Sequence, residues 1–275
     1  MNTQGASRTA GAPSAAQRPA AREQGARPLL QLRNVSKRFG GVVAVNDVSL
    51  DLYAGEVVAL VGNNGAGKSS IMRLIFGLHA PDDGTVVLDG EPVRFRGPRD
   101  ARERGIESVP QELALAGHLS VAANIFLGRE ITRGFGPFRI LDKRAMRARA
   151  EELVTSFGIH IPDMSDRVFN MSGGQQQGVA IARATAWGSR IVVLDEPTAA
   201  LGPAETARVE RTILRLKEAG LAVILVSHDL EQVFRVSDRI AVMRRARCVA
   251  QIETADSSTD QVVALITGSS LGAAA

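Results

Sequence analysis

Short apolar stretches that alternate with polar positions begin at Leu29 and predict a β-rich opening. They include Leu30, Leu32 and Val35, then Val42 to Val45, then Val48, Leu50 and Leu52. The uninterrupted apolar run Val57 to Val61 is typical of a buried strand, and a helical stretch from Met72 to Leu78 follows it after a Gly-rich loop. Further on, Asp89-Gly90 lies between two apolar stretches, Thr85 to Leu88 and Val93 to Phe95, which predicts a hairpin.

Residues 113 to 170 follow a different pattern. Charged positions dominate, and the apolar residues Met146, Leu153 and Phe157 recur at helical spacing within Asp142 to Phe157. A Gly-rich loop is expected at Arg133 to Pro137. The pattern therefore predicts a separate, mostly helical lobe.

The pattern of a strand, a helix and a second strand returns after this lobe. Ile191 to Leu194 is a buried strand, Glu205 to Lys217 is an amphipathic helix that stops at Gly220, and Leu221 to Val226 is the next strand. A helix that joins two strands in this way is a crossover connection, so the sheet is expected to be at least partly parallel.

The bulk composition fits an ordinary globular protein with an unusual start. At 275 residues and 45% hydrophobic content the chain can bury a large core, and a single cysteine excludes an intramolecular disulfide and a multi-cysteine metal site. No apolar run approaches the roughly 18 residues of a membrane-spanning helix. If the protein works at a membrane, another chain must cross it.

The first 28 residues carry most of the excess positive charge. Arg8, Arg18, Arg22 and Arg27 stand against Glu23, which accounts for three of the four net positive charges and leaves the body close to neutral. A nearly neutral body gives no electrostatic argument for nucleic-acid binding. The segment lacks Val, Ile, Leu and Phe, so we expect a disordered tail, with a transit peptide and weak attraction to a membrane surface as alternatives.

The loop between the strand Val57 to Val61 and the following helix has the phosphate-loop pattern G-x-x-x-x-G-K-S. Its glycines let successive N–H groups point at phosphate oxygens, and the helix that follows adds its positive end. Lys68 would bind the β and γ phosphates, and the Ser69 hydroxyl would bind Mg2+. The predicted nucleotide-binding residues are Gly62, Asn63, Asn64, Gly65, Ala66, Gly67, Lys68, Ser69 and Ser70.

Two carboxylates follow the buried strand Ile191 to Leu194. A phosphate loop with bound Mg2+ needs one acid at such a strand end to hold the metal shell, and Asp195 is the expected one. Glu196 points in another direction and is the expected general base for the attacking water. The alternative is a solvated strand end with two ordinary acids.

Ser172, Gly173, Gly174 and Gln175 begin a predicted helix, and Ser172 with Gln175 forms a capping-box pattern. Two glycines in the first turn weaken a helix unless something approaches its backbone closely. Because a helix N-terminus binds anions, this segment predicts a second phosphate-binding surface. A simple helix start is the alternative.

The phosphate loop, VPQE, SGGQQ, LDEP and VSHD occur in the order and spacing of ATP-binding cassette (ABC) proteins, which the chain resembles over about Leu29 to Gly268. The resemblance implies that the SGGQ helix faces the γ-phosphate held by the other subunit of a head-to-tail dimer. It implies that Phe39 stacks on adenine, unless this aromatic simply packs on the sheet. Gln111 would sense Mg2+ and water and link to a transmembrane partner, and His228 would contact the γ-phosphate.

Residues 111 to 130, 195 to 202 and 264 to 268 resemble the monosaccharide importers of the second carbohydrate uptake class. The resemblance implies permease subunits, an extracytoplasmic sugar-binding protein as an indirect partner, and a place on the cytoplasmic face of the plasma membrane. This chain has one set of motifs, so the second cassette would be another polypeptide, most simply a copy of itself. Two departures stand out. Gly202 replaces the aspartate usual in the dimer-contact loop, and Gly178 lies inside the signature helix without a reason visible in the sequence.

Together these features predict an α/β protein with a P-loop NTPase (RecA-like) core, a β-rich N-terminal part and an inserted helical subdomain. The predicted divisions are a tail at 1–28, an ATPase domain at 29–268 and a tail at 269–275. Within the domain the core spans about 29–112 and 181–255, and the helical subdomain about 113–180. The expected function is ATP hydrolysis, with ATP and Mg2+, for sugar import. The alternatives are another cargo, such as an amino acid or lipid, or a soluble protein acting on ribosomes or DNA.

Overall fold

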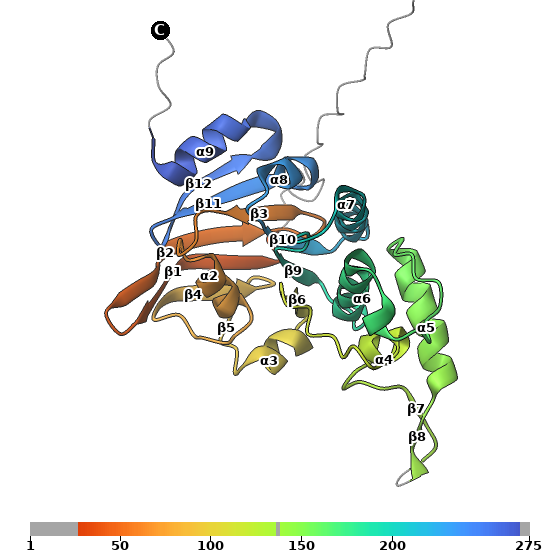
Figure 1. The fold of residues 1–275 in the computed structure, drawn as a ribbon. Coiled ribbons are helices and arrows are strands. Elements are labelled where there is room, and N and C mark those ends of the chain that lie inside the picture. The colour runs from red at the N-terminus through yellow and green to blue at the C-terminus, as the bar shows by residue number, and fades with distance from the viewer. Residues whose placement is uncertain (1–26, 136–137, 270–275) are drawn as a thin grey trace, which may run out of the picture.

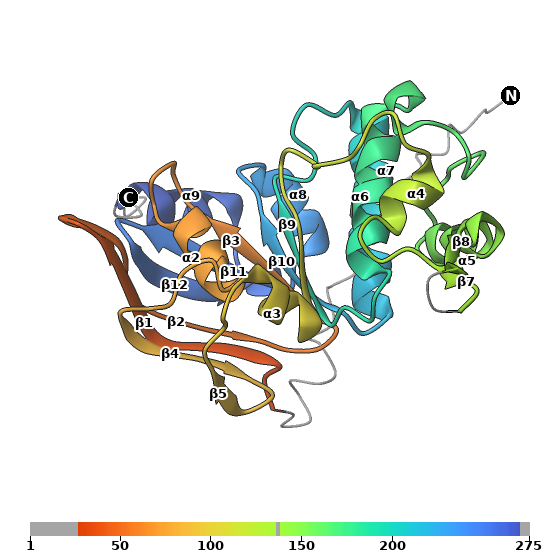
Figure 2. The same cartoon turned by 90° about the horizontal axis from the view of Figure 1, so that it is seen from below.

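The computed structural model describes residues 27–135 and 138–269. Both predicted tails therefore lie almost wholly outside the described residues. Within the described ranges, no helix is long and apolar enough to cross a membrane. The described residues form two large sheets with helices between and around them, and a lobe of helices at one side (Figures 1 and 2).

The predicted β-rich opening is confirmed as an antiparallel sheet in the order β2-β1-β4-β5. Its strands are β1 (Leu30–Phe39), β2 (Val42–Leu52), β4 (Asp83–Leu88) and β5 (Glu91–Val93). The expected hairpin around Asp89-Gly90 is β4 and β5. The apolar stretches Val42 to Val45 and Val48 to Leu52 belong to one strand, β2. Between them Asp47 takes a positive φ angle, and its carboxylate accepts a hydrogen bond from the side chain of Asn34 on β1 (2.9 Å). This irregularity is a β-bulge, and the strand continues through it.

The second sheet is the predicted parallel core. Its order is β12-β11-β3-β10-β9-β6, and every neighbouring pair is parallel except β11 and β12. The crossover helix between β9 and β10 is α7 (Pro203–Glu218), as the sequence predicts. The strands are β3 (Val57–Val61), β6 (Ile106–Val109), β9 (Ile191–Asp195), β10 (Ala222–Val226), β11 (Arg239–Arg244) and β12 (Arg247–Glu253).

Each face of the parallel sheet packs against a different layer. Helix α2 (Lys68–Ile75) lies between the two sheets, where its buried Ile71, Leu74 and Ile75 share one apolar cluster with both. The opposite face packs against α7 and the helical lobe. Smaller elements complete the surface: α3 (Pro98–Glu103), α8 (Leu230–Val236), η3 (Thr254–Asp256) and α9 (Thr259–Thr267).

The lobe is mostly helical, as predicted, and also contains a small hairpin that the sequence pattern did not predict. The expected helix is α5 (Lys143–Ser156), capped by the Asp142 carboxylate. The expected Gly-rich loop connects β7 (Thr132–Arg133) to β8 (Ile140–Leu141), although Pro137 lies outside the described residues. Strands of two residues are too short to produce an alternating pattern. The other lobe elements are α4 (Val121–Ile125), η2 (Val168–Asn170) and α6 (Gly173–Thr185).

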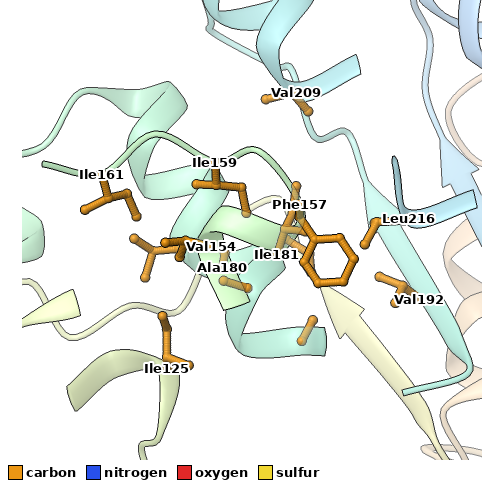
Figure 3. Close-up of a cluster of buried hydrophobic side chains, with 14 of the residues drawn as sticks. Ile125, Val154, Phe157, Ile159, Ile161, Ala180, Ile181, Val192, Val209 and Leu216 are labelled. Atoms are coloured by element: carbon orange, nitrogen blue, oxygen red, sulfur yellow. The ribbon is translucent and has the colours of Figure 1, made fainter. Parts of the chain in front are cut away.

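The lobe and the parallel sheet share one apolar core. Figure 3 shows lobe side chains such as Phe157 close to Val192 of the sheet, with Ile181 of α6 beside them. Helix α6 runs without a break through residues 180 and 181, where the sequence places a subdomain boundary. That division stays a prediction, because the packing is continuous across it.

The presence of glycine at position 178, inside helix α6, is explained by close packing. A Cβ atom at this position would lie 2.5 Å from Cγ2 of Ile159, a buried residue in the segment after α5. Glycine therefore lets Ile159 pack directly on the backbone of α6. The conformational cost of a helical glycine, about 1 kcal/mol, is offset by this close contact.

We expect Gly178→Ala to lower the free energy of unfolding by about 1–2 kcal/mol, because the cost of overpacking exceeds the gain in helix propensity. Urea unfolding checks this expectation. In the Gly178→Ala/Ile159→Ala double variant the clash is removed, so the alanine at 178 should cost far less in that background. A single variant more stable than wild type would contradict the packing argument.

Candidate functional site

The phosphate-loop segment lies at the carboxyl end of β3, between this buried strand and α2. Gly62, Gly65 and Gly67 take φ angles of 146°, 79° and 107°, which other residues rarely adopt. A Cβ atom at Gly62 would overlap the Met243 carbonyl oxygen, and one at Gly67 would lie 2.6 Å from the Ala44 carbonyl oxygen. The loop is therefore shaped by close contacts with β11 and β2 as well as by its own sequence.

Lys68 is the first residue of α2, and its side chain folds back along the loop. Its Nζ atom donates to the carbonyl oxygens of Gly62 (2.6 Å) and Asn63 (3.2 Å). Burial lowers the pKa of Lys68, and the nearby carboxylates of Glu196 and Asp195 partly oppose this shift. Two backbone carbonyls thus hold the lysine ammonium over the loop.

The two predicted acids lie at the end of β9, beside Lys68. Burial raises the pKa of Asp195, the adjacent Glu196 raises it further, and Lys68 opposes the shift. Glu196 adopts a positive φ of 50°, and its N–H donates to the Val226 carbonyl oxygen (2.8 Å). The strand therefore ends at Asp195, and Glu196 begins the turn that follows it.

His228 holds the Glu196 carboxylate. Its Nδ1 atom lies 2.7 Å from Oε2 of Glu196, and its backbone N–H approaches the same oxygen (3.4 Å). The imidazole itself is 75% exposed, so it sits at the surface of the site with the carboxylate behind it. Because both contacts from His228 reach Oε2, the other carboxylate oxygen of Glu196 stays free to accept a proton.

A cleft of about 440 Å³ brings most of the predicted residues together. The hydroxyl of Ser69, the amide of Gln111 and the carboxylate of Asp195 all line it, and such oxygens are the hard ligands that Mg2+ prefers. Among the described residues, no cluster of three or more His, Cys, Asp or Glu side chains is present. The cleft is lined by Val42, Val43, Ala44, Asn64, Gly65, Ala66, Gly67, Lys68, Ser69, Ser70, Gln111, Asp195, Glu196 and Val226.

Phe39 ends β1, three residues before the apolar residues that open the cleft wall at Val42. Its ring is 39% exposed and meets the ring of His79 edge to face, with centroids 4.9 Å apart. The Nζ atom of Lys37 lies 5.7 Å from its centroid. A partly exposed aromatic ring whose strand partner is Val42 of the cleft wall suits a flat heterocycle. The sequence did not indicate Val42, Val43 or His79, since isolated apolar residues and a single histidine carry no local motif.

Ser172, Gly173, Gly174 and Gln175 begin α6 and do not line this cleft. The predicted capping box is present: the Ser172 hydroxyl accepts from the Gln175 N–H (3.3 Å), and the Gln175 side-chain oxygen accepts from the Ser172 N–H (3.0 Å). The helix start therefore lies outside the cleft that the phosphate loop of its own chain lines.

The two glycines of this segment lie against Leu201 and Glu205. A Cβ atom at Gly173 would lie 2.9 Å from the Leu201 side chain, and one at Gly174 would lie 3.0 Å from the Glu205 side chain. The Gly174 N–H donates to Oε1 of Glu205 (3.3 Å), and hydrogen bonds from Ser172 and Gly174 lower the pKa of this carboxylate. Glu205 thus occupies the anion-binding helix start, a contact that no motif in the sequence indicates.

Gly202, where the resemblance leads one to expect aspartate, is the N-cap residue of α7 and offers no side chain to cap it. Pro203 at the first helical position and the acidic Glu205 in the first turn support the helix start instead.

A parallel core sheet with a glycine-rich loop between a buried strand and a helix defines a P-loop NTPase. The family model of the ABC transporter matches residues 45–199. The chain is 45% identical over 245 residues to the fructose import ATP-binding protein FrcA of Rhizobium meliloti, which covers 88% of this chain and 94% of that one. It is 41% identical to the xylose/arabinose import ATP-binding protein XylG of Sulfolobus acidocaldarius, covering 89% and 96% of the two chains.

The ribose import ATP-binding protein RbsA 2 of Rubrobacter xylanophilus is 44% identical over 92% of this chain, which spans 48% of that longer protein. Among solved structures, a nucleotide-free ATP-binding cassette from an ABC transporter matches the fold with a TM-score of 0.74 at 23% identity, covering 88% of this chain and 96% of that one. The dimeric cassette MJ0796 matches with a TM-score of 0.68 at 26% identity, covering 82% and 98%.

The chain belongs to the ABC transporter family. It is accordingly an ATP-binding ATPase, as the sequence analysis expects.

Proposed function

We propose that this chain is the ATP-hydrolysing subunit of an importer that takes up a monosaccharide through a separate transmembrane permease. The observation that carries the proposal is the cleft that joins the phosphate loop to Gln111, Asp195 and Glu196. The relatives named for fructose and for xylose or arabinose import match nearly their whole length. They support a sugar as the cargo.

The phosphate loop binds the nucleotide. N–H groups of Asn63, Asn64, Gly65 and Gly67 turn toward the β and γ phosphates, and the start of α2 adds its positive end. When nucleotide binds, the Lys68 ammonium exchanges its two carbonyl partners for phosphate oxygens. Its hydrogen bonds become stronger, because the phosphate oxygens are charged. The remaining predicted residues Gly62, Ala66, Ser69 and Ser70 complete the loop and the first helical turn.

Ser69, Gln111 and Asp195 would hold Mg2+, whose charge offsets that of the β and γ phosphates. Asp195 must be ionised to bind Mg2+. Lys68 already opposes the rise in its pKa that burial causes, so the site favours the carboxylate once a further positive charge is near.

Glu196 accepts a proton from the attacking water. His228 binds one carboxylate oxygen and fixes its direction, so that the second oxygen can face the γ-phosphate. The exposed imidazole is also placed to contact that phosphate once nucleotide is bound. His228 is therefore a positioning residue for the base in addition to its predicted contact with phosphate.

The start of α6 acts on a nucleotide held by a second subunit, most simply another copy of this chain. Two observations support this arrangement. Ser172 to Gln175 lie outside the cleft of their own chain, and the similar cassette MJ0796 is a dimer. The γ-phosphate of the partner's ATP would displace the Glu205 carboxylate from Gly174, because both are anions that need the same N–H group.

The permease provides the path across the membrane, and this chain binds to its cytoplasmic side through the region around Gln111 and the helical lobe. An extracytoplasmic sugar-binding protein delivers the cargo to the permease. The near-neutral body of the chain supports a protein partner over nucleic acid.

Phe39→Ala should weaken ATP binding by about 1 kcal/mol, roughly fivefold in Kd, through loss of one stacking contact, while kcat stays close to wild type. Titration with a fluorescent ATP analogue and steady-state hydrolysis separate the two effects. Phe39→Trp is the matched variant and should retain the affinity. Unchanged affinity in the alanine variant would assign Phe39 to packing against His79 instead.

The test of the function is sugar uptake in the source organism after deletion of the gene. Uptake of one monosaccharide among fructose, ribose, xylose, arabinose and galactose should fall to background while amino-acid uptake persists. The wild-type gene should restore uptake, and a Glu196→Gln gene should not. Normal uptake of every sugar, or a defect confined to amino acids, would contradict the proposal.

A further inference from the structure

The loop that begins with Glu196, residues 196–202, has a strained backbone. Glu196 and Ala200 take φ angles of 50° and 64°, a left-handed conformation that residues other than glycine rarely adopt. Within the loop, the Glu196 carbonyl oxygen accepts from the Ala199 N–H (3.1 Å). A strained loop keeps its shape only where the surrounding structure holds it. The direction of the Glu196 side chain therefore depends on what contacts this loop from outside.

The side chain of Gln232 contacts the loop from helix α8. It is fully buried, and its Nε2 atom donates to the hydroxyl of Thr198 (2.9 Å). Thr198 lies two residues after Glu196, inside the strained segment. The two bonded side chains are 34 positions apart in the sequence, so this hydrogen bond fixes the loop against a separate element of the fold.

Helix α8 is a firm support for this contact. It packs beside α7 (Figures 1 and 2), where the Arg235 guanidinium donates to both carboxylate oxygens of Glu210 at 2.8 to 3.1 Å. Its Val233 and Val236 are buried in the apolar clusters. Its first turn is capped by Asp229, whose carboxylate accepts from the N–H of Gln232 (3.1 Å). The helix is therefore held at both ends, and the loop can be held against it.

The start of α8 contacts the loop at a second point. His228 immediately precedes the capping residue of this helix, and its Nδ1 atom lies 2.7 Å from Oε2 of Glu196. The two contacts join the same pair of segments, with Glu196 and Thr198 on one side and His228 and Gln232 on the other. One contact alone would let the loop pivot, whereas two contacts fix its orientation.

We propose that Gln232 is a positioning residue for ATP hydrolysis: its bond to Thr198 holds the loop 196–202 in the conformation that directs Glu196 toward the attacking water. Gln232 does not line the nucleotide cleft, so it acts through Glu196. The inference rests on the proposed role of Glu196 as the general base. Such positioning matters because a displacement of about 1 Å at a reacting group can slow a reaction on the order of a hundredfold.

The second polar atom of the Gln232 amide separates this role from a role in stability. Within the described part of the chain, Oε1 of Gln232 is buried and has no hydrogen-bond partner. Such an atom is unfavourable, so its removal offsets the loss of the bond to Thr198. Methionine is similar in length and lacks the amide, and the half-buried Thr198 can bond to water instead. Gln232→Met should therefore keep the stability of the fold.

Gln232→Met should lower kcat for ATP hydrolysis about tenfold and leave the Kd for ATP within about twofold of wild type. Hydrolysis is measured at saturating ATP and at a protein concentration where wild-type specific activity is constant. A fluorescent ATP analogue gives Kd, and thermal unfolding should give a melting temperature close to that of wild type. A side chain needed for packing alone would not combine a tenfold loss of kcat with unchanged stability and affinity.

Variants of the bonding partner test whether the effect passes through this one hydrogen bond. Thr198→Val removes the hydroxyl and should lower kcat by a similar factor, whereas Thr198→Ser keeps the hydroxyl and should retain wild-type activity. The Gln232→Met/Thr198→Val double variant should be no slower than either single variant, because both substitutions break the same bond. In the Glu196→Gln background, Gln232→Met should slow the residual hydrolysis no further, because it acts through that carboxylate.

Gln251→Met is the matched control. Gln251 lies on β12, outside the cleft, and its Nε2 atom donates to the Ser49 carbonyl oxygen (3.0 Å), so the substitution removes a similar bond elsewhere and should leave kcat unchanged. Wild-type kcat in Gln232→Met, while Glu196→Gln is inactive, would overturn the inference and leave the general base in place. Multiplied losses in the double variant, or a fall in melting temperature that accounts for the lost activity, would also overturn it. Normal hydrolysis by Glu196→Gln would overturn the proposed general base and this inference together.

Discussion

Glu196→Gln will bind ATP about as well as the wild type and hydrolyse it at least about a hundredfold more slowly. An amide cannot accept the proton of the attacking water, while the phosphate contacts of the loop remain. The substitution keeps the shape of the side chain, and the amide oxygen can still accept from His228, so the site should stay assembled. Single-turnover hydrolysis and equilibrium ATP binding measure the two effects separately, and ATP should trap the variant as a dimer.

Glu231→Gln is the matched control for this variant. Glu231 lies on α8 with an 87% exposed side chain and pairs with Arg235, so its loss should leave kcat unchanged. If Glu196→Gln hydrolysed ATP at a rate near that of the control, Glu196 would not be the general base. The proposed role of His228 would then also fail, because the histidine acts there through this carboxylate.

Ser172→Arg will bind ATP as the wild type does in dilute solution, yet it will neither dimerise with ATP nor hydrolyse it. The arginine places a bulky side chain where the partner's γ-phosphate must approach the N–H groups of α6, whereas the chain's own phosphate loop is untouched. Wild-type specific activity should rise with protein concentration as dimers form, and that of the variant should stay near zero. Lys68→Ala should instead lose ATP binding itself.

Two further variants make this result specific to the shared site. Ser172→Ala removes the helix cap at a cost of about 1 kcal/mol without adding bulk, so it should retain more activity than the arginine variant. Ser156→Arg puts the same side chain at the exposed end of α5 and should behave as wild type. Mixing Ser172→Arg with Lys68→Ala gives heterodimers with one intact site, and some activity should return. Normal hydrolysis by Ser172→Arg alone would exclude the shared-site mechanism.

The elements predicted best are those whose signal lies within a few neighbouring residues. The buried strand Val57–Val61 and the capping box at Ser172 follow from a local apolar run and local side-chain chemistry, and the structure confirms them. The phosphate loop is also local, so its place at the end of β3 could be derived before the fold was known.

The contacts that the sequence could not indicate join segments far apart in the chain. The glycine at position 178 is explained by its close contact with Ile159, and the glycine at position 174 by its contact with Glu205, whose carboxylate occupies the start of α6. Phe39 could be placed near the nucleotide by resemblance, but its contact with His79 depends on how the antiparallel sheet lies against the loop after α2. Such pairs are set by tertiary packing and leave no periodic pattern in either segment.

The position of β3 in the sheet also governs when the nucleotide site can form during synthesis. This strand carries the phosphate loop near the start of the chain, yet both of its neighbours, β10 and β11, come more than 150 residues later. Two residues of β11 also contact the segment around β3. Arg239 pairs with the fully buried Glu56 just before β3, and the Met243 carbonyl oxygen packs against Gly62 just after it. Until the ribosome has released β10, the apolar strand Val57–Val61 has neither neighbour, so the emerging chain must hold an unpaired, aggregation-prone segment through much of its translation.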